Sequence, residues 1–275
     1  MGLLSGFKEI TFFPAVPTMI NAIINHPRAG DLDLPRLFGL LNSGAAPMPV
    51  ELIQQIKEMG ISYSEGWGMS ETTSLGISNP VLGLRKTGSI GLPWPDTDVR
   101  LVDVETGKKN VPKGEPGEII IKSPLVMKGY WNKREETAQQ MVDGWLHTGD
   151  IAVQDEDDYF FIVDRKKDMI IAGGYNIYPR EIEEVLYQHE DIRDACAIGV
   201  PDSYRGETVK VFVVPKEGQP LTEADVLKFC EGKLAAYKRP KLVEFRKDLP
   251  KSAVGKILRK KLREEEANRR AESKE

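Results

Sequence analysis

Short apolar runs alternate with helical patterns along residues 8–80, and this rhythm constrains the fold more than any other feature of the chain. Strands are predicted at residues 10–13, 37–41 and 61–63. Amphipathic stretches at 18–25 and 49–59 separate them, and the second stretch has proline in its first turn and Gly60 directly after its end. Strands that alternate with helices favour parallel pairing, so we predict an α/β sheet for residues 1–84.

Turns become frequent after residue 85, and the apolar pattern changes from helical to alternating. Alternation at residues 99–104 and 118–122 predicts strands, with glycine-containing turns between them. We therefore predict a small β-barrel or meander for residues 85–163.

Residues 169–275 have the length of an ordinary separate domain. Strands are predicted at 169–171, 195–200, 209–214 and 242–246, and helices at 179–188, 222–234 and 257–271. This mixture predicts a compact α+β domain. The charged string at 164–168 precedes it in place of a Gly/Ser linker, and we predict a short hinge there, although a solvated charge run is the commoner explanation of such a string.

The composition argues against several functional classes. The net charge of −4 is opposite to the basic excess of a nucleic-acid binder. No apolar run in the sequence reaches the roughly 18–20 residues that span a bilayer. Cys196 and Cys230 do not form a CxxC pair, so we expect buried free thiols. Free thiols fit a reducing compartment, and we expect a cytoplasmic protein.

Two glycine-containing clusters follow predicted strands, and the ends of strands are where α/β sheets commonly bind ligands. The first consists of Ser43, Gly44, Ala45, Ala46 and Pro47. Small side chains let the backbone approach a flat ligand closely, but a plain tight turn is the commoner explanation of such a run.

The second cluster consists of Glu65, Gly66, Trp67, Gly68, Met69, Ser70 and Glu71. Its glycines allow the backbone to bend while Trp67 presents an aromatic face to a base. Ser70 has a hydroxyl for a phosphate, and Glu71 has the oxygen ligands that Mg²⁺ prefers. The alternative is a strand-end loop with a buried tryptophan and a solvated glutamate.

Three later motifs add further binding groups. Asp150, in Thr-Gly-Asp, would accept bonds from both ribose hydroxyls, although an aspartate in a turn is common. Gly173 and Gly174 admit close approach of a ligand or of another backbone, and Tyr175 would line a narrow passage. Lys256 lies on a loop bounded by proline and glycine, where a cation could reach a closing site and stabilise charge on an α-phosphate. A surface lysine is the alternative.

Taken together and in this order, these motifs resemble the AMP-forming acyl-CoA synthetases of the adenylate-forming superfamily. The match covers nearly the whole chain, and residues 117–132, 144–150 and 164–183 look most like long- and medium-chain fatty-acid–CoA ligases. The resemblance implies a truncated large domain, with a partial α/β sheet and a small β-barrel, followed by a small mobile α+β lid domain. It implies that a carboxylate and Mg·ATP give acyl-AMP and pyrophosphate, after which the CoA thiol displaces AMP.

The resemblance also implies roles for individual residues. AMP and ATP would contact Ser43, Gly44, Ala45, Ala46, Pro47, Glu65, Gly66, Trp67, Gly68, Met69, Ser70, Asp150, Arg165 and Lys256. Lys256 would be the adenylation lysine, and Glu71 would bind Mg²⁺. Lys167 would be the hinge residue. Gly173, Gly174 and Tyr175 would border the CoA channel, and Val16, Pro17 and Met19 would line the acyl pocket, together with Gly44, Ala45 and Met69.

The sequence departs from the family pattern in one large respect. The Ser/Thr/Gly-rich loop that holds the β- and γ-phosphates in the family has no counterpart here, and much of the large sheet is missing with it. Ser70 also stands where threonine is commoner. We therefore expect incomplete activity from this chain alone, and an exposed sheet edge covered by self-association or by a companion chain.

Two other functions stay open. The chain could belong to an adenylation enzyme for another carboxylate, such as an aryl or amino acid. An early aspartate would meet an amino acid's ammonium group, and its absence near residues 12–15 favours an apolar acid. Alternatively, the chain could bind AMP or CoA without catalysis.

Overall fold

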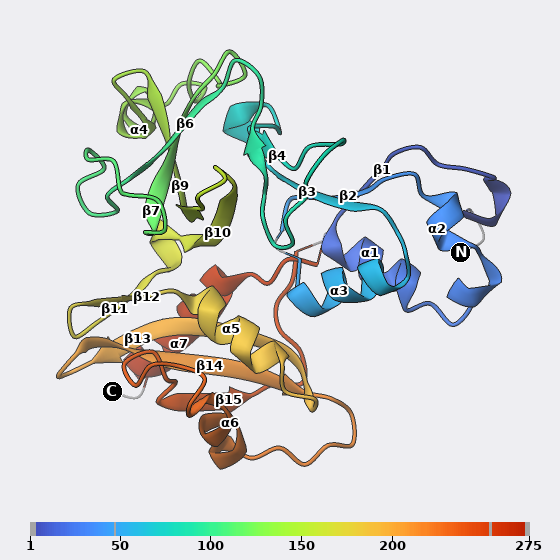
Figure 1. Cartoon of the computed structure of the whole chain (residues 1–275). Helices are drawn as coiled ribbons and strands as arrows, with labels where there is room; N and C mark the ends of the chain where they lie inside the picture. Colours follow the sequence, from blue (N-terminus) through green and yellow to red (C-terminus); the bar gives the residue numbers. More distant parts are fainter. Residues whose placement is uncertain (1–3, 47, 253–254, 273–275) are drawn as a thin grey trace. The chain divides into compact units, whose positions relative to one another are not determined.

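The computed structural model describes residues 4–46, 48–252 and 255–272. The chain forms two compact units, Met1–Ile162 and Val163–Glu275 (Figure 1). The division lies next to the charged string at 164–168. None of the helices in the described part of the chain is both long and apolar enough to cross a bilayer.

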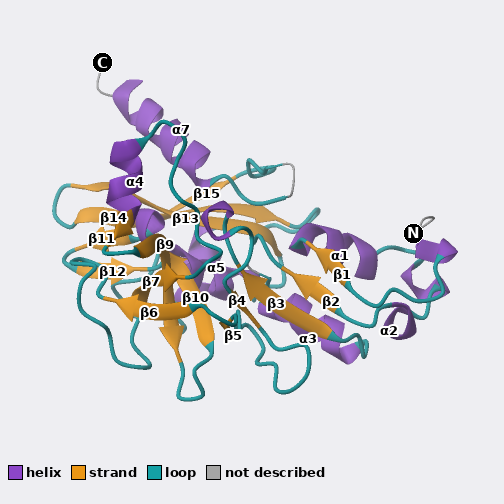
Figure 2. Cartoon of the chain, turned by 90° about the horizontal axis from the view of Figure 1, so that it is seen from above, coloured by secondary structure: helices purple, strands orange, loops and turns teal. Residues whose placement is uncertain are grey.

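The first sheet of the N-terminal unit combines parallel and antiparallel strands. Its order is β1 (Phe13–Ala15), β2 (Leu41–Ser43), β3 (Tyr63–Trp67), β4 (Ile77–Ser78) and β5 (Leu92–Pro93). The first three strands are parallel, as predicted, and the last two pair antiparallel. Helices α1 (Pro17–Ile24) and α3 (Val50–Glu58) lie alongside the parallel strands (Figure 2). Their apolar faces, including Ile20 and Ile53, form one buried core with Leu41.

All three predicted strands in this region begin later than expected, and β3 starts at Tyr63, where the strand predicted at 61–63 ends. The run at 10–13 contributes only Phe13 to β1, and Ile10 makes an isolated bridge to Phe38. Leu37, predicted to start a strand, instead ends the short helix α2 (Leu34–Leu37). The Asp33 side chain accepts a hydrogen bond from the backbone N–H of Arg36 and caps this helix, so local capping overrides the apolar run.

The second sheet of this unit is an antiparallel meander. Its strands are β6 (Asp98–Val102), β7 (Gly117–Lys122), β9 (Trp145–Gln154) and β10 (Phe160–Arg165), with β8 (Met141–Val142) paired to β9. Helix α4 (Arg134–Gln140) precedes β8. Trp67 and Ile77 of the first sheet share a buried core with Ile119 and Leu146 of the second. This core places the ends of β3 and β9 in one packed region.

The C-terminal unit is an α+β domain with helices on both faces of its sheet. The strand order is β12 (Tyr175–Ile177), β11 (Ile170–Ala172), β14 (Gly206–Pro215) and β13 (Ile192–Asp202), with β15 (Leu242–Phe245) parallel to β14. The helices are α5 (Pro179–Tyr187), α6 (Glu223–Cys230) and α7 (Arg259–Glu272).

The two faces of this sheet follow the period of two in β13. Ala195 and Ala197 pack in the core that contains Val226 of α6. Cys196 between them faces the opposite core, which contains Leu262 of α7. Cys196 and Cys230 are buried free thiols, as expected.

Candidate functional site

A hydrogen bond joins two of the predicted nucleotide-binding motifs. The indole Nε1–H of Trp67, at the end of β3, donates to Oδ2 of Asp150 over 2.7 Å. The two residues are 83 positions apart in the sequence. The bond fixes the orientation of the Asp150 carboxylate and uses one of its two oxygens.

Asp150 lies in a bulge of strand β9, so the alternative of an aspartate in a plain turn was wrong. Along the β7–β9 pair, Glu118 opposes Ile151 and Ile120 opposes His147. Residues 148–150 therefore face the single residue Ile119. Gly149 adopts a φ of +71°, which glycine accepts without steric cost. The bulge bends β9 and directs the Asp150 carboxylate toward Trp67.

Trp67 is a core residue as much as a candidate ligand contact. It is 9% exposed and packs in the core between the two sheets. A Cβ placed on Gly76 would lie 2.8 Å from the indole ring, so this glycine allows the ring its position. The alternative of a buried tryptophan at a strand end describes this packing, and stacking on a base stays a prediction.

Glu71 makes a side-chain contact that the sequence did not indicate. It lies in the short 3₁₀-helix η3 (Ser70–Thr72), and its Oε1 accepts a hydrogen bond from the Tyr130 hydroxyl over 2.7 Å. This bond, together with burial, raises the pKa of Tyr130 to about 12, so the phenol remains a donor at neutral pH. Glu71 is therefore oriented, and the alternative of a freely solvated glutamate was wrong.

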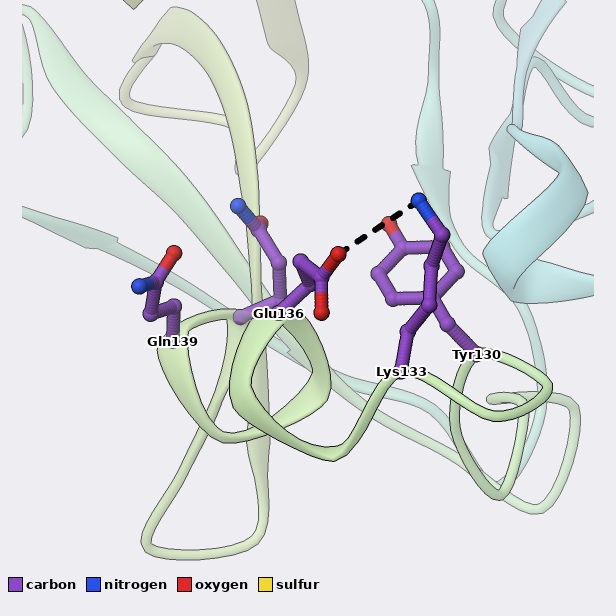
Figure 3. Close-up of a pocket in the computed structure, with 5 residues that line it drawn as sticks. Tyr130, Lys133, Glu136 and Gln139 are labelled. Atoms are coloured by element: carbon purple, nitrogen blue, oxygen red, sulfur yellow. Dashed lines mark ion pairs between the residues drawn. The ribbon is translucent and has the colours of Figure 1, made fainter.

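A pocket of about 300 Å³ adjoins Tyr130 (Figure 3). It is lined by Tyr130, Lys133, Glu136, Gln139 and Gln140. Lys133 Nζ lies 3.4 Å from Glu136 Oε1, and both residues belong to the α4 region. No sequence motif predicted this pocket, because its polar side chains are typical of any exposed helix.

The two glycine-containing clusters lie next to each other at the C-terminal ends of β2 and β3 in the first sheet. Ser43 is paired with Glu65 across the parallel strands β2 and β3. A Cβ placed on Gly44 would lie 3.5 Å from the carbonyl oxygen of Gly66. Ala45 has a φ of 67°, a left-handed conformation that is uncommon outside glycine and is often found at functional sites. Pro47 lies outside the described residues.

Two side-chain hydroxyl groups of β2 and β3 are buried close to these strand ends. The Oγ of Ser43 and the hydroxyl of Tyr63 have no hydrogen-bond partner within the described residues. Burial raises the pKa of the Tyr63 phenol, and the Glu65 carboxylate raises it further. Tyr63 was not assigned from the sequence, because it lies inside an apolar strand pattern.

Gly68 has a packing role in the second cluster. A Cβ on Gly68 would lie 2.2 Å from the carbonyl oxygen of Ser74, so any side chain there would clash with backbone. Met69 and Ser70 follow directly at the start of η3. The glycine is thus explained by the turn itself, without a ligand.

The predicted acyl-pocket residues do not share one environment. Pro17 is buried as the first residue of α1, and Val16 is half-buried at its N-cap. Met19 is 47% exposed on the same helix. Their role in binding an acyl chain stays a prediction.

The string at 164–168 is ordered by its own contacts, so the solvated alternative was wrong for its aspartates. The Asp164 carboxylate accepts a hydrogen bond from the backbone N–H of Arg180 over 2.8 Å. Asp168 pairs with Arg259 at 3.0 Å and with Arg263 at 2.8 Å, both on α7. The two carboxylates are 5% and 7% exposed.

The other residues of the string are less buried. Arg165 is half-buried at the end of β10, and Lys167 is exposed in the 3₁₀-helix η4 (Lys166–Asp168). The carbonyl oxygen of Lys167 accepts from Arg263 over 2.9 Å. The ribose contact of Arg165 and the hinge role of Lys167 stay predictions.

Gly173 and Gly174 form the two-residue turn of the β11–β12 hairpin. Their φ values are 61° and 81°, as a type I′ turn requires at both positions. Tyr175 follows, and its ring stacks on that of Tyr237 with centroids 4.5 Å apart. The backbone conformation explains both glycines, so their use in a CoA channel needs separate support.

Basic side chains flank this hairpin, and the sequence did not single them out. The backbone N–H of Gly173 donates to the carbonyl oxygen of Arg205 over 2.8 Å. Arg205 Nη2 donates to the carbonyl oxygen of Tyr237, and Lys238 Nζ lies 5.6 Å from the Tyr237 ring. The hairpin therefore lies beside an aromatic pair and Arg205, whereas Lys238 is paired with both oxygens of the Glu181 carboxylate at 2.7 Å.

Lys256 lies on a closed loop. The backbone N–H of Lys256 donates to Ser252 Oγ at 3.2 Å, and the Lys256 carbonyl accepts from the Ser252 N–H at 2.8 Å. Lys251 and Ile257 form a bridge at the base of the loop. Residues 253 and 254 lie outside the described part.

A Mg²⁺ site among the described residues would have fewer than three protein carboxylates. Among the described residues, no group of three or more His, Cys, Asp or Glu side chains could enclose a metal ion. Mg²⁺ commonly binds to one or two carboxylates together with substrate phosphates, so the oriented Glu71 fits this mode.

Comparisons with known proteins point to one group of enzymes. The family model for AMP-binding enzyme matches residues 7–131, and the model for the AMP-binding enzyme C-terminal domain matches residues 181–256. The long-chain-fatty-acid–CoA ligase of Bacillus subtilis (strain 168) is 52% identical over 257 residues, which are 93% of this chain and 46% of that protein. The ligase of the same name from Escherichia coli O6:H1 is 46% identical, over 94% of this chain and 46% of its own.

The fold is similar to that of solved enzymes. The crystal structure of ATP-bound MatB from Rhodopseudomonas palustris superposes with a TM-score of 0.88 at 36% identity. The match covers 96% of this chain and 52% of that one. The chain thus spans about half the length of the relatives that it matches.

Proposed function

Because the chain belongs to the AMP-binding enzyme family, we propose that it provides two parts of a long-chain fatty-acid–CoA ligase. These are the AMP-binding strand ends of the first sheet and the C-terminal domain. The hydrogen bond between Trp67 and Asp150 carries this proposal, since it brings two separate nucleotide motifs together. The identity of 52% to a fatty-acid ligase supports the substrate class.

The Asp150 carboxylate would accept hydrogen bonds from the ribose hydroxyls, and the strand ends at Gly44 and Gly66 would admit the flat adenine. Lys256 would stabilise the negative charge that develops as the carboxylate attacks the α-phosphate and pyrophosphate leaves. Arg165 adds a cation to the ribose region. Mg²⁺, held by Glu71 and the phosphates, would neutralise phosphate charge.

CoA would enter beside the β11–β12 hairpin. Its thiol sulfur attacks the acyl carbonyl of the acyl-adenylate, and AMP leaves with its phosphate oxygen. The Gly173–Gly174 turn presents no side chain to the pantetheine arm. Arg205 would offer positive charge to the phosphates of CoA.

Binding of AMP is the first test of this function. Isothermal titration of the chain with AMP should show saturable binding. Asp150→Ala should weaken it by about 10- to 100-fold, because a hydrogen bond to a charged group contributes about 1.5–3 kcal/mol. Asp157→Ala is the matched control, since Asp157 is 69% exposed and pairs with Lys86 in the same unit. Absence of binding at millimolar AMP would contradict the proposal.

Catalysis is tested by ATP–pyrophosphate exchange with palmitate. Exchange should depend on Lys256, and Lys256→Ala should lower it by about 10²–10³-fold. Binding of AMP without exchange would favour a second function, a nucleotide- or CoA-binding protein without catalysis.

We further propose that another polypeptide surface covers the edge of the first sheet. Strand β1 is the outer strand of that sheet, and Phe12 and Met19 beside it are 51% and 47% exposed. Edge strands and apolar patches favour association. Sedimentation velocity should show self-association that increases with concentration, or a complex with a companion chain. A monomer at all concentrations, alone and with candidate companion chains, would contradict this expectation.

A further inference from the structure

The loop at residues 125–133, directly before α4, is hydrogen-bonded to the segment that contains Glu71. The backbone N–H of Met127 donates to the carbonyl oxygen of Glu71 over 2.7 Å. The Thr73 hydroxyl donates to the carbonyl oxygen of Leu125 over 2.8 Å. The Tyr130 hydroxyl adds a bond to the Glu71 carboxylate at 2.7 Å. Both the main chain and the side chain of Glu71 are thus held by one loop.

Tyr130 is itself held in place. Its backbone N–H donates to Thr137 Oγ1 over 2.9 Å, and the Thr137 hydroxyl donates to the carbonyl oxygen of Lys133 over 2.7 Å. A Cβ on Gly129 would lie 2.8 Å from the Thr137 side chain, so glycine is needed for this close approach. Tyr130 projects from this loop beside Lys133 (Figure 3). The phenol therefore reaches Glu71 from a fixed position.

We infer that Tyr130 is a positioning residue that orients the Glu71 carboxylate for a Mg²⁺–nucleotide complex. The inference rests on the proposed function, because it takes Glu71 as the Mg²⁺ ligand. The hydrogen bond engages Oε1, one of the two oxygens of the Glu71 carboxylate. A phenol donates without a positive charge, so it orders the carboxylate and leaves its negative charge for a cation. A lysine or arginine in the same place would neutralise that charge.

The test measures how much Mg²⁺ strengthens ATP binding. Calorimetric titrations of ATP with excess Mg²⁺ and with EDTA give the ratio of the two dissociation constants for the wild type, Tyr130→Phe and Glu71→Gln. Tyr130→Phe should reduce this ratio by about 10-fold or more, because partners that orient a metal ligand typically contribute 10- to 100-fold in metal affinity. AMP affinity in EDTA should remain unchanged.

A double-mutant cycle separates positioning from general loss of structure. Because Tyr130 acts through Glu71, adding Tyr130→Phe to Glu71→Gln should cause no further loss of Mg²⁺ dependence. Tyr159→Phe is the matched control: it removes the hydroxyl that donates to the carbonyl oxygen of Leu84 over 2.6 Å in the same unit. This variant should retain the wild-type ratio.

Three results would overturn the inference. Tyr130→Phe could keep the wild-type ratio, its effect could add fully to that of Glu71→Gln, or Tyr159→Phe could cause the same loss. Failure of the proposed nucleotide binding is distinguishable, because in that case the wild type itself would bind neither AMP nor ATP, and failure of catalysis alone would appear as AMP binding without exchange.

Discussion

Replacing Arg259 with methionine should lower the free energy of unfolding of the C-terminal unit by about 3–5 kcal/mol, the usual effect of breaking a buried ion pair. The guanidinium lies 2.7 Å from Glu183, 3.0 Å from Asp168 and 3.8 Å from Asp164. Although burial disfavours its charge, the Glu183 and Asp164 carboxylates raise the pKa of Arg259 above its ordinary value. Methionine would leave buried carboxylates without this cation.

The stability of the C-terminal unit can be measured separately from that of the N-terminal unit. All four tryptophans, at positions 67, 94, 131 and 145, belong to the N-terminal unit, so their fluorescence reports on that unit alone. Hydrogen exchange of the C-terminal amides should rise in Arg259→Met while tryptophan fluorescence stays unchanged. Lys260→Met is the matched control on the same helix, because Lys260 is 84% exposed. Equal exchange in the two variants would contradict the buried-pair argument.

The same cluster bears on the predicted hinge. Asp164 precedes Lys167 in the chain, yet its carboxylate accepts from the N–H of Arg180, which follows Lys167. Any change of the backbone torsions at Lys167 that separates these two residues must therefore break that bond. Charged residues at 164–168 thus belong to the packed C-terminal unit, and their spacing in the sequence did not show this.

Substitution of Trp67 by alanine should destabilise the N-terminal unit by about 3–5 kcal/mol, as expected for a large aromatic side chain in a core. Trp67→Phe should cost less, about 1–3 kcal/mol, since most of the packing is kept and only the bond to Asp150 is lost. AMP affinity should fall by about 10-fold in Trp67→Phe, because Asp150 loses its orientation.

Chemical denaturation followed by circular dichroism, combined with AMP titration, checks this prediction. Trp131→Ala is the control, because Trp131 is 90% exposed and should contribute less than about 0.5 kcal/mol. If Trp67→Ala lost AMP binding at wild-type stability, the ring would be a stacking surface and not a core residue. If Trp67→Phe bound AMP normally, the bond to Asp150 would have no part in binding.

Elements with strong local signals were predicted well. Helix α3 lies within the predicted 49–59, and α6 lies within the predicted 222–234, capped at Thr222 by reciprocal bonds with Asp225. Strand β9 was missed because the Thr-Gly-Asp bulge interrupts its alternation. Helix α2 was missed because its four residues lie in an apolar run typical of a strand.

The residue types of the candidate site were determined by the sequence alone, as were the order of its motifs and the alternation of strands and helices. These are local properties, set by apolar periodicity, turn residues and helix caps. Only the tertiary structure decided which donor meets which carboxylate: Trp67 meets Asp150, Tyr130 meets Glu71, and Arg259 meets Asp168. Those pairings depend on strand register, on a bulge and on loop packing between distant residues, and no periodicity within one segment encodes them.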